Sequence, residues 1–258
     1  MKSARANGSS SSRTRRIVWF SILAVVVAFL VAVSAFVIWT QDTYAAGARG
    51  IESIESDSRL QLYERDGLTV LAPASESNGR GIVFLPGAKV ESEAYATTFA
   101  EVAAAGTTVV IVNPFLNLAL VEPRSFEEYT AVAPDVTTWA VGGHSMGGVK
   151  ACQYAEVAEV DALLLLASYC SGVDLADRDL DVLTLLGSED GVINSNALRD
   201  ARGLLPADAV WSTIEGATHA QFGDYGPQDG DGVATISDAA AHVAIGVALA
   251  SFLDGASE

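Results

Sequence analysis

The stretch WAVGGHSMGGVKA, residues 139–151, decides how the rest of the chain is interpreted. Four glycines surround one serine, between a run typical of a β-strand and a segment typical of a helix. Glycines are placed in this way in phosphate-binding loops, dinucleotide-binding turns and nucleophile elbows. A phosphate-binding loop requires Gly-Lys followed by Ser or Thr, whereas here Lys150 follows Val149 and precedes Ala151. A dinucleotide-binding turn follows the first strand of its unit, whereas this stretch follows roughly the fifth.

The segment Gly143-His144-Ser145-Met146-Gly147 satisfies the pattern G-x-S-x-G between a strand and a helix, which is the context of a nucleophile elbow. In such an elbow the serine occupies a strained turn with its hydroxyl clear of the backbone. Side chains at Gly143 and Gly147 would collide there. The amino end of the following helix also directs N–H groups and a positive dipole toward developing negative charge. We therefore predict Ser145 as a nucleophile.

A base and an acid are expected after the serine, in the order acid and then histidine. Of the three histidines, His219 follows the last predicted strand, on a loop at the carboxyl edge of the sheet, where a base can reach Ser145. His144 lies inside the elbow, and its side chain is expected to point away from the substrate. His242 lies within the last predicted helix. We therefore predict His219 as the general base.

The acid is expected at the end of a neighbouring strand, because the carboxyl ends of parallel strands meet at one crevice. Asp190 comes directly after the predicted strand 181–187, in a turn bracketed by Gly187 and Gly191. Asp174, after the preceding strand, is the alternative. The acid would hold the imidazole in the correct tautomer and stabilise its cation.

An oxyanion hole requires two backbone donors. The N–H of Met146 supplies one, and the loop PGAKVE, residues 86–91, is expected to supply the other. Gly87 allows a close backbone approach in this loop, so we predict Ala88 as the second donor.

Strand-like runs alternate with helix-like ones over most of the chain. The predicted strands are 60–64, 68–72, 81–85, 107–113, 136–143, 162–168, 181–187 and 209–215, and the predicted helices are 91–105, 146–158, 193–205 and 237–254. Continuous apolar strands separated by helices predict a mainly parallel sheet of about eight strands, covered by helices on both faces. The first two strands flank Arg65-Asp66-Gly67, a hairpin signal that predicts an antiparallel edge.

The chain begins with a basic tail and an apolar segment. Residues 1–16 carry five basic and no acidic residues, and residues 17–39 carry no charge over 23 residues, which is enough to cross a bilayer as a helix. We expect a cytoplasmic tail, a signal anchor over 17–39 and a linker over 40–57. A cleavable signal peptide remains the alternative, because Ala46 and Ala48 resemble a cleavage site.

The charge of the remaining chain is strongly acidic. Without the five basic residues of the tail, ten Lys and Arg stand against 32 Asp and Glu, a net charge of about −22. Such a charge argues against nucleic acid or anionic lipid headgroups as partners, and a solvated surface is its ordinary explanation.

The segments FLPGAKVESEAYA, NPFLNLAL, GGHSMGGVKA, GSEDGV and GATHAQFGDYGPQDGDG together resemble the α/β-hydrolase superfamily, in particular a small bacterial branch related to dienelactone hydrolases. The resemblance covers roughly residues 58–254 and implies an α/β-hydrolase domain over 58–258. It also implies Ser145 as nucleophile, Asp190 as acid and His219 as base. The chain has Pro86-Gly87 where many relatives have His-Gly, and residues 168–180 are too few for the lid domain of other members.

Two further groups of residues, the cysteines and a set of aspartates, are candidates for a disulfide and a metal site. Cys152 and Cys170 are the only cysteines, and the sequence leaves open whether they form a disulfide or two buried thiols. Asp224, Asp229 and Asp231 miss the spacing of a calcium-binding loop, so we predict no metal site, and the expected reaction needs no cofactor.

The function predicted from these features is a serine hydrolase, esterase-like, acting on a small-molecule or lipid-like acyl substrate through an acyl-enzyme. We expect a single-pass protein of a bacterial cytoplasmic membrane, with the N-terminus inside and the catalytic domain outside. The alternatives are an acyltransferase with the same triad and a non-catalytic surface-binding module on the same fold.

Overall fold

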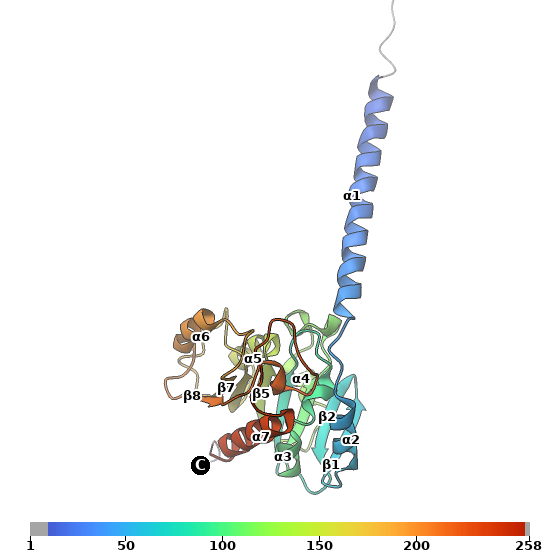
Figure 1. The fold of residues 1–258 in the computed structure, drawn as a ribbon. Helices are drawn as coiled ribbons and strands as arrows, with labels where there is room; N and C mark the ends of the chain where they lie inside the picture. Colours follow the sequence, from blue (N-terminus) through green and yellow to red (C-terminus); the bar gives the residue numbers. More distant parts are fainter. Residues whose placement is uncertain (1–9, 256–258) are drawn as a thin grey trace, which may run out of the picture. The chain divides into compact units, whose positions relative to one another are not determined.

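The alternating runs of the sequence form one eight-stranded sheet in the computed structural model, which describes residues 10–255 (Figure 1). The strands are β1 (Leu60–Arg65), β2 (Leu68–Pro73), β3 (Arg80–Leu85), β4 (Thr108–Val112), β5 (Thr138–His144), β6 (Ala162–Leu166), β7 (Asp181–Gly187) and β8 (Val210–Ile214). Their order is β1-β2-β4-β3-β5-β6-β7-β8. β1, β2 and β4 pair antiparallel, and every other pair is parallel. The predicted mainly parallel sheet of eight strands with an antiparallel edge is confirmed.

The central strands are apolar throughout because both of their faces are covered. In β3, Ile82 and Phe84 belong to one buried core, whereas Val83 and Leu85 belong to the other, as the two-residue period of a strand requires. The residues of β4, TVVIV, are buried along their whole length. Strands of this kind, rich in β-branched residues, are typical of a parallel sheet between two helical layers.

Helices cover both faces of the sheet. They are α2 (Ala48–Ser56), α3 (Ala100–Ala104), α4 (Phe126–Thr130), α5 (Met146–Val157), α6 (Ser195–Ala201) and α7 (Asp238–Gly255), with short 3₁₀ turns η1 (Ser92–Tyr95), η2 (Phe115–Asn117), η3 (Ala119–Val121), η4 (Arg202–Leu204) and η5 (Ala220–Phe222). Buried side chains of α2, α3 and α7 join the first core, and those of α4 and α5 join the second. The predicted covering of both faces is confirmed.

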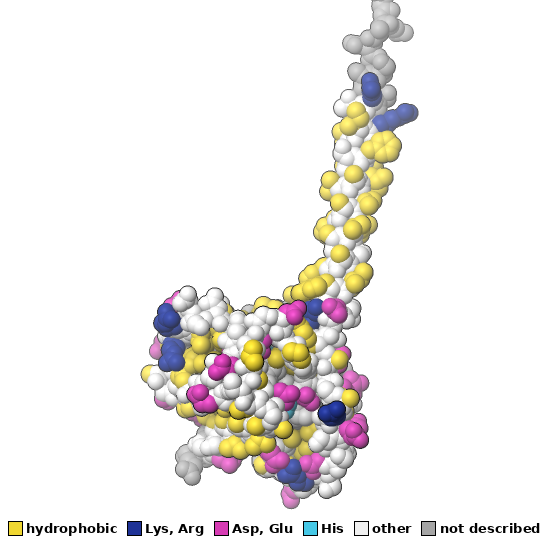
Figure 2. All heavy atoms as spheres, viewed as in Figure 1, with side chains coloured by type: hydrophobic (Ala, Val, Ile, Leu, Met, Phe, Trp, Pro, Cys, Tyr) yellow, Lys and Arg dark blue, Asp and Glu magenta, His cyan; other side chains and the backbone are white. Residues whose placement is uncertain are grey.

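The N-terminal unit ends at Asp42 and contains α1 (Ser10–Thr40), a single uninterrupted helix. Its segment Arg13–Thr40 is long and apolar enough to cross a membrane. Figure 2 shows hydrophobic side chains along this helix and Lys or Arg side chains at its N-terminal end. Among the described residues, α7 passes the same test, but Ala241, Ile245 and Leu249 pack it into the core of the folded unit.

Two segments differ from the sequence expectations. Residues 43–57, expected within a linker, fold onto the second unit: Tyr44 pairs with Val90, and α2 buries Ile54 against the core. The predicted helix 91–105 is divided into η1 and α3 by a turn. In that turn the hydroxyl of Thr98 donates to the carbonyl of Phe222 at 3.1 Å, which joins the turn to η5.

Candidate active site

The polypeptide passes from β5 into α5 through a strained turn at Ser145. This residue has φ 52° and ψ −122°, a conformation that costs a non-glycine residue about 1–3 kcal/mol. Its N–H donates to the carbonyl of Leu166 at 3.0 Å, which holds the turn against the end of β6. Ser145 therefore lies at the carboxyl edge of the parallel strands, as the elbow pattern predicted.

The two elbow glycines are required by the close approach of backbone segments. A Cβ atom at Gly143 would overlap the backbone of Gly147, and a Cβ atom at Gly147 would overlap the carbonyl of Leu85 at the end of β3. The steric reason given for the pattern G-x-S-x-G is therefore present in this chain. An alanine at either position would displace the turn that carries Ser145.

A residue that the sequence did not single out fixes the peptide after the serine. The carbonyl of Ser145 accepts from the Ser168 hydroxyl at 2.6 Å and from the Gly148 N–H at 3.1 Å. Because the peptide unit is planar and trans, holding this carbonyl also fixes the direction of the Met146 N–H, which points the opposite way. Ser168 is buried just beyond β6, and nothing in its local sequence distinguishes it from other serines.

Asp190 and His219 are brought together from the loops after β7 and β8. Oδ2 of Asp190 lies 2.8 Å from Nδ1 of His219, and their side chains are 1% and 2% exposed. Oδ1 of Asp190 accepts from the N–H groups of Val192 and Ile193 at 2.8 and 2.9 Å, which orients the carboxylate. Asp174, the alternative acid, instead caps its own turn by accepting from the N–H of Ala176.

The second nitrogen of His219 is available for chemistry. With Nδ1 held by Asp190, the remaining atom Nε2 is buried and has no hydrogen-bond partner among residues 10–255. The His219 ring lies 4.6 Å, centroid to centroid, from the ring of His144, which immediately precedes Ser145 in the chain. A buried imidazole with one nitrogen on a carboxylate and the other unpaired has the arrangement of a general base.

His144 has a structural role that differs from that of His219. It is buried, and its Nδ1 lies 2.9 Å from the Tyr95 hydroxyl, whose oxygen accepts the N–H of Gly87 at 2.9 Å. The hydroxyl proton of Tyr95 is then left for Nδ1, which assigns neutral His144 the tautomer protonated at Nε2. Burial and the neighbouring His219 hold the pKa of His144 well below 6.5. The elbow and the loop after β3 are thus connected through Tyr95.

Asp231 joins the loop that carries Asp190 to the loop that carries His219. Its carboxylate accepts from the N–H groups of Gly191, His219, Ala220 and Gly232 at 2.8–3.1 Å. Burial raises the pKa of Asp231, but the four donors outweigh it and hold the pKa below its ordinary value. The sequence drew attention to Asp231 only as part of a rejected calcium pattern.

The two predicted oxyanion donors lie in turns that leave their N–H groups unused. Met146 is the first residue of α5, where an N–H has no partner within the helix. Ala88 lies in the loop after β3, and no hydrogen bond is donated by its N–H within the described part of the chain. Tyr95 fixes the preceding residue Gly87, and Lys89 donates its N–H to the carbonyl of Asn117 at 2.8 Å.

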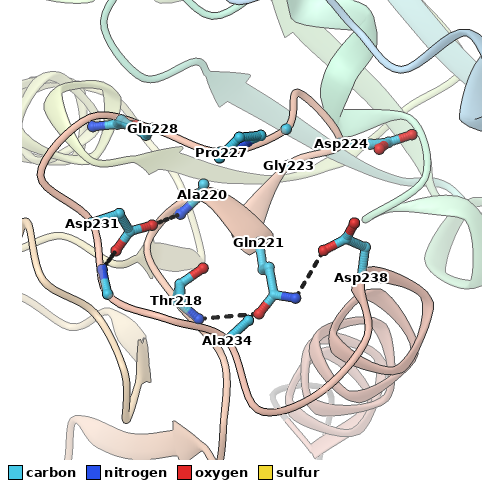
Figure 3. Close-up of a pocket in the computed structure, with 12 residues that line it drawn as sticks. Thr218, Ala220, Gln221, Gly223, Asp224, Pro227, Gln228, Asp231, Ala234 and Asp238 are labelled. Atoms are coloured by element: carbon cyan, nitrogen blue, oxygen red, sulfur yellow. Dashed lines mark hydrogen bonds between the residues drawn. The ribbon is translucent and has the colours of Figure 1, made fainter.

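A cavity of about 200 Å³ lies behind the loop that follows His219. Figure 3 shows Gln221 at its centre, accepting from the Thr218 N–H at 3.1 Å and donating to Asp238 at 2.8 Å. Neither Ser145, Asp190 nor His219 lines this cavity. The cavity is therefore not the site where Ser145 would meet a substrate.

The two cysteines form a disulfide between α5 and the loop after β6. Cys152 and Cys170 have Cα atoms 5.6 Å apart, which resolves the choice that the sequence left open. The bridge fastens the helix that begins at the elbow to the segment that contains Ser168. Residues 167–180, all described, form no helix or strand, so no lid domain follows β6.

A metal ion is not needed to explain these contacts. Among residues 10–255, no group of three or more His, Cys, Asp or Glu side chains is placed to hold a metal ion. In the His219 loop, the carboxylate of Asp231 instead accepts hydrogen bonds from backbone N–H groups.

Comparisons with known proteins show the family of this chain. A family model described as the alpha/beta hydrolase family matches residues 81–242, more than half of the chain. None of the curated proteins matches the chain in sequence.

Two solved structures share its fold at low sequence identity. A predicted CIB-like hydrolase from Thermoplasma acidophilum has a TM-score of 0.52 and 17% identity, covering 76% of this chain and 97% of its own. The esterase domain of a Rhodothermus marinus protein has a TM-score of 0.51 and 14% identity, covering 75% of this chain and 96% of its own. At these identities the likeness is one of fold.

Proposed function

The chain belongs to the alpha/beta hydrolase family, and we propose that it is an esterase-like serine hydrolase that cleaves carboxylic esters or related acyl compounds through an acyl-enzyme. The observation that carries this proposal is the combination at one sheet edge of a serine in a strained elbow and a buried Asp190–His219 pair at 2.8 Å. Family membership establishes a hydrolase of the α/β type, and the residue roles are our assignment.

In the proposed reaction, the hydroxyl of Ser145 attacks the acyl carbonyl while Nε2 of His219 takes its proton. Asp190 keeps the ring in the tautomer with Nδ1 protonated and stabilises the cation that forms. The N–H groups of Met146 and Ala88 stabilise the negative charge on the carbonyl oxygen. His219 then protonates the leaving alcohol. Water, deprotonated by His219, releases the acid and restores Ser145.

We propose further that α1 anchors the enzyme in the cytoplasmic membrane of a bacterium, with residues 1–16 inside and the catalytic unit outside. The basic residues before the apolar helix support this orientation, because positive residues stay on the cytoplasmic side. The Cys152–Cys170 disulfide supports export, because disulfides persist in oxidising compartments.

A fluorophosphonate probe tests the proposed function. It should label the full-length protein once, at Ser145, because the elbow presents this hydroxyl and His219 can remove its proton. Ser145→Ala and His219→Ala should each abolish labelling, and the double variant should behave as either single one, because the residues act as a unit.

His242→Ala is the matched control, because this histidine lies in α7 and takes no part in the proposed reaction. It should keep wild-type labelling. Folded protein that takes no label at neutral pH, or a tag that maps to another serine, would show that the assignment of Ser145 is wrong.

A further inference from the structure

Three large hydrophobic side chains are exposed beside the proposed oxyanion loop. Phe115, Leu120 and Val121 are 58%, 43% and 50% exposed, and we call them the apolar edge. They lie in the segment that follows β4, and β4 runs parallel to β3, so this segment begins at the same edge of the sheet as Ala88. The carbonyl of Asn117, within the segment, accepts the N–H of Lys89.

The segment that carries the apolar edge is held rigidly. The Glu122 carboxylate, 1% exposed, accepts from the N–H of Phe115 at 2.6 Å and pairs with Nε of Arg124 at 2.6 Å. Arg124 in turn donates to the carbonyl of Asn113 at 2.7 Å. A buried carboxylate with these partners fixes both ends of the segment, so the exposure of the apolar edge is built into the fold.

The connection from α1 is joined to the same edge. The Tyr44 N–H donates to the carbonyl of Lys89 at 2.7 Å, and the Tyr44 carbonyl accepts from the N–H of Glu91 at 3.1 Å. The Glu91 carboxylate also accepts from the Thr43 hydroxyl at 2.9 Å. Tyr44 follows the last residue of α1, Thr40, by only four positions, and a four-residue connection spans at most about 14 Å.

We propose that the apolar edge rests on the bilayer that α1 spans, and that the enzyme takes acyl esters resident in that bilayer as substrates. The proposal rests on the proposed function and on α1 as a membrane anchor. A short connection that ends beside the oxyanion loop holds the catalytic edge at the membrane surface, where ester groups of membrane lipids lie.

The contact with the bilayer is apolar rather than electrostatic. The chain beyond its basic tail carries a net charge of about −22, which repels anionic headgroups. Hydrophobic side chains that enter the interface gain free energy without requiring lipid charge. Zwitterionic phosphatidylcholine is therefore the lipid for a test.

The test changes the length of the connection and nothing else. A flexible Gly/Ser segment of about 24 residues, inserted between Asp42 and Thr43, gives a mean span of roughly 27 Å and releases the catalytic edge from the bilayer. The full chain is reconstituted in phosphatidylcholine vesicles that contain 4-methylumbelliferyl oleate. The soluble ester 4-methylumbelliferyl acetate, with the same leaving group, is assayed in parallel. Rates are divided by the amount of active enzyme, counted with the fluorophosphonate probe.

The insertion should lower turnover of the vesicle-bound oleate by roughly tenfold, because effective concentration falls steeply with tether length. Turnover of the acetate should remain unchanged. The same segment inserted between Asp66 and Gly67, in the β1–β2 hairpin, is the matched control and should change neither rate, because a side chain added at Gly67 would meet only open space.

An insertion after Asp42 that leaves oleate turnover unchanged would overturn the proposal, and so would one that lowers both rates equally. Failure of the proposed function is distinguishable, because the unmodified enzyme would then take no probe and hydrolyse neither ester.

A second variant tests the apolar edge itself. Phe115→Ser with Leu120→Ser should lower oleate turnover per active site at least fivefold, because two interfacial anchors are lost. Crosslinking of the full chain in detergent tests whether a second copy of the chain, rather than the bilayer, covers the apolar edge. If these substitutions abolish a dimer and leave oleate turnover unchanged, the apolar edge is a contact between two copies and the proposal fails.

Discussion

At the scale of single residues, the groups to which we assign a chemical role were easier to single out from the sequence than the groups that hold them in place. Ser145, Asp190 and His219 are recognisable because their patterns are local: a glycine-flanked serine, and an acid and a histidine just after strands. Tyr95, Ser168 and Asp231 each bond to a residue far along the chain, at separations of 49, 23 and 40 residues, and such contacts leave no local signal. Only the folded chain reveals them.

Replacing Asp190 by Asn should lower kcat by roughly 10⁴-fold while the fold stays intact, because the imidazole of His219 would be held in the wrong tautomer. The backbone contacts of Oδ1 to Val192 and Ile193 can be kept by Asn. Steady-state hydrolysis of a soluble ester measures the effect. Asp174→Asn, at the alternative acid, should change kcat less than tenfold, and the opposite ranking would reassign the acid.

The buried His144 should make stability depend on pH. Its pKa is lowered in the folded protein by burial and by His219, so only the unfolded chain binds a proton as the pH falls below about 6.5. The free energy of unfolding therefore decreases as the pH falls through this range, by up to about 1.4 kcal/mol per pH unit.

His144→Asn keeps a polar atom for Tyr95 but cannot titrate, so its stability should fall less steeply between pH 6.5 and 5. Thermal unfolding of the full chain in detergent, at matched ionic strength, measures both slopes. Equal slopes would mean that His144 is not the titrating group.

At the scale of elements, the strands were predictable because their apolar, β-branched runs reflect burial on both faces. The helices were less predictable than the strands. The predicted helix 91–105 is interrupted by a turn in which Thr98 bonds to Phe222, a contact far along the chain that leaves no local signal. The expected linker 40–57 is largely ordered because Tyr44 pairs with Val90 and α2 packs beneath β1. Its glycines and charges are typical of a linker, and the pairing that orders it is long-range.

The disulfide between α5 and the loop after β6 closes a loop of 18 residues. Replacing Cys152 and Cys170 together by Ala should destabilise the folded unit by roughly 3 kcal/mol, because the unfolded chain regains its conformational freedom. The melting temperature should fall by roughly 5–10 °C in a thermal scan. Wild-type protein treated with a reductant should match the double variant, and a reductant without effect would contradict the prediction.

At the scale of the whole molecule, charge and hydropathy divide the chain into a basic tail, an apolar helix and an acidic folded unit. The division after Asp42 follows this composition closely. Composition predicted a linker over 40–57, within which this division falls, and it gave no indication that the connection ends on the catalytic edge.

A protease added to intact cells should digest the unit beyond Asp42, because the proposed topology places it outside the membrane. A tag on the N-terminal tail should be protected in the same cells and should become accessible after lysis. The tag should also remain joined to the catalytic unit, whereas a cleaved signal peptide would separate them. Protection of the catalytic unit in intact cells would refute the proposed export.

The four hydrogen bonds of Asp231 have a consequence for local unfolding of the site. One carboxylate bonds to both the turn after β7 and the turn after β8, so detaching either turn breaks a contact with the other. Local fluctuations of proteins proceed through small cooperative units, and these two turns form one such unit. We therefore expect the acid and the base to be lost in a single opening event, without a half-assembled site in which the histidine lacks its carboxylate.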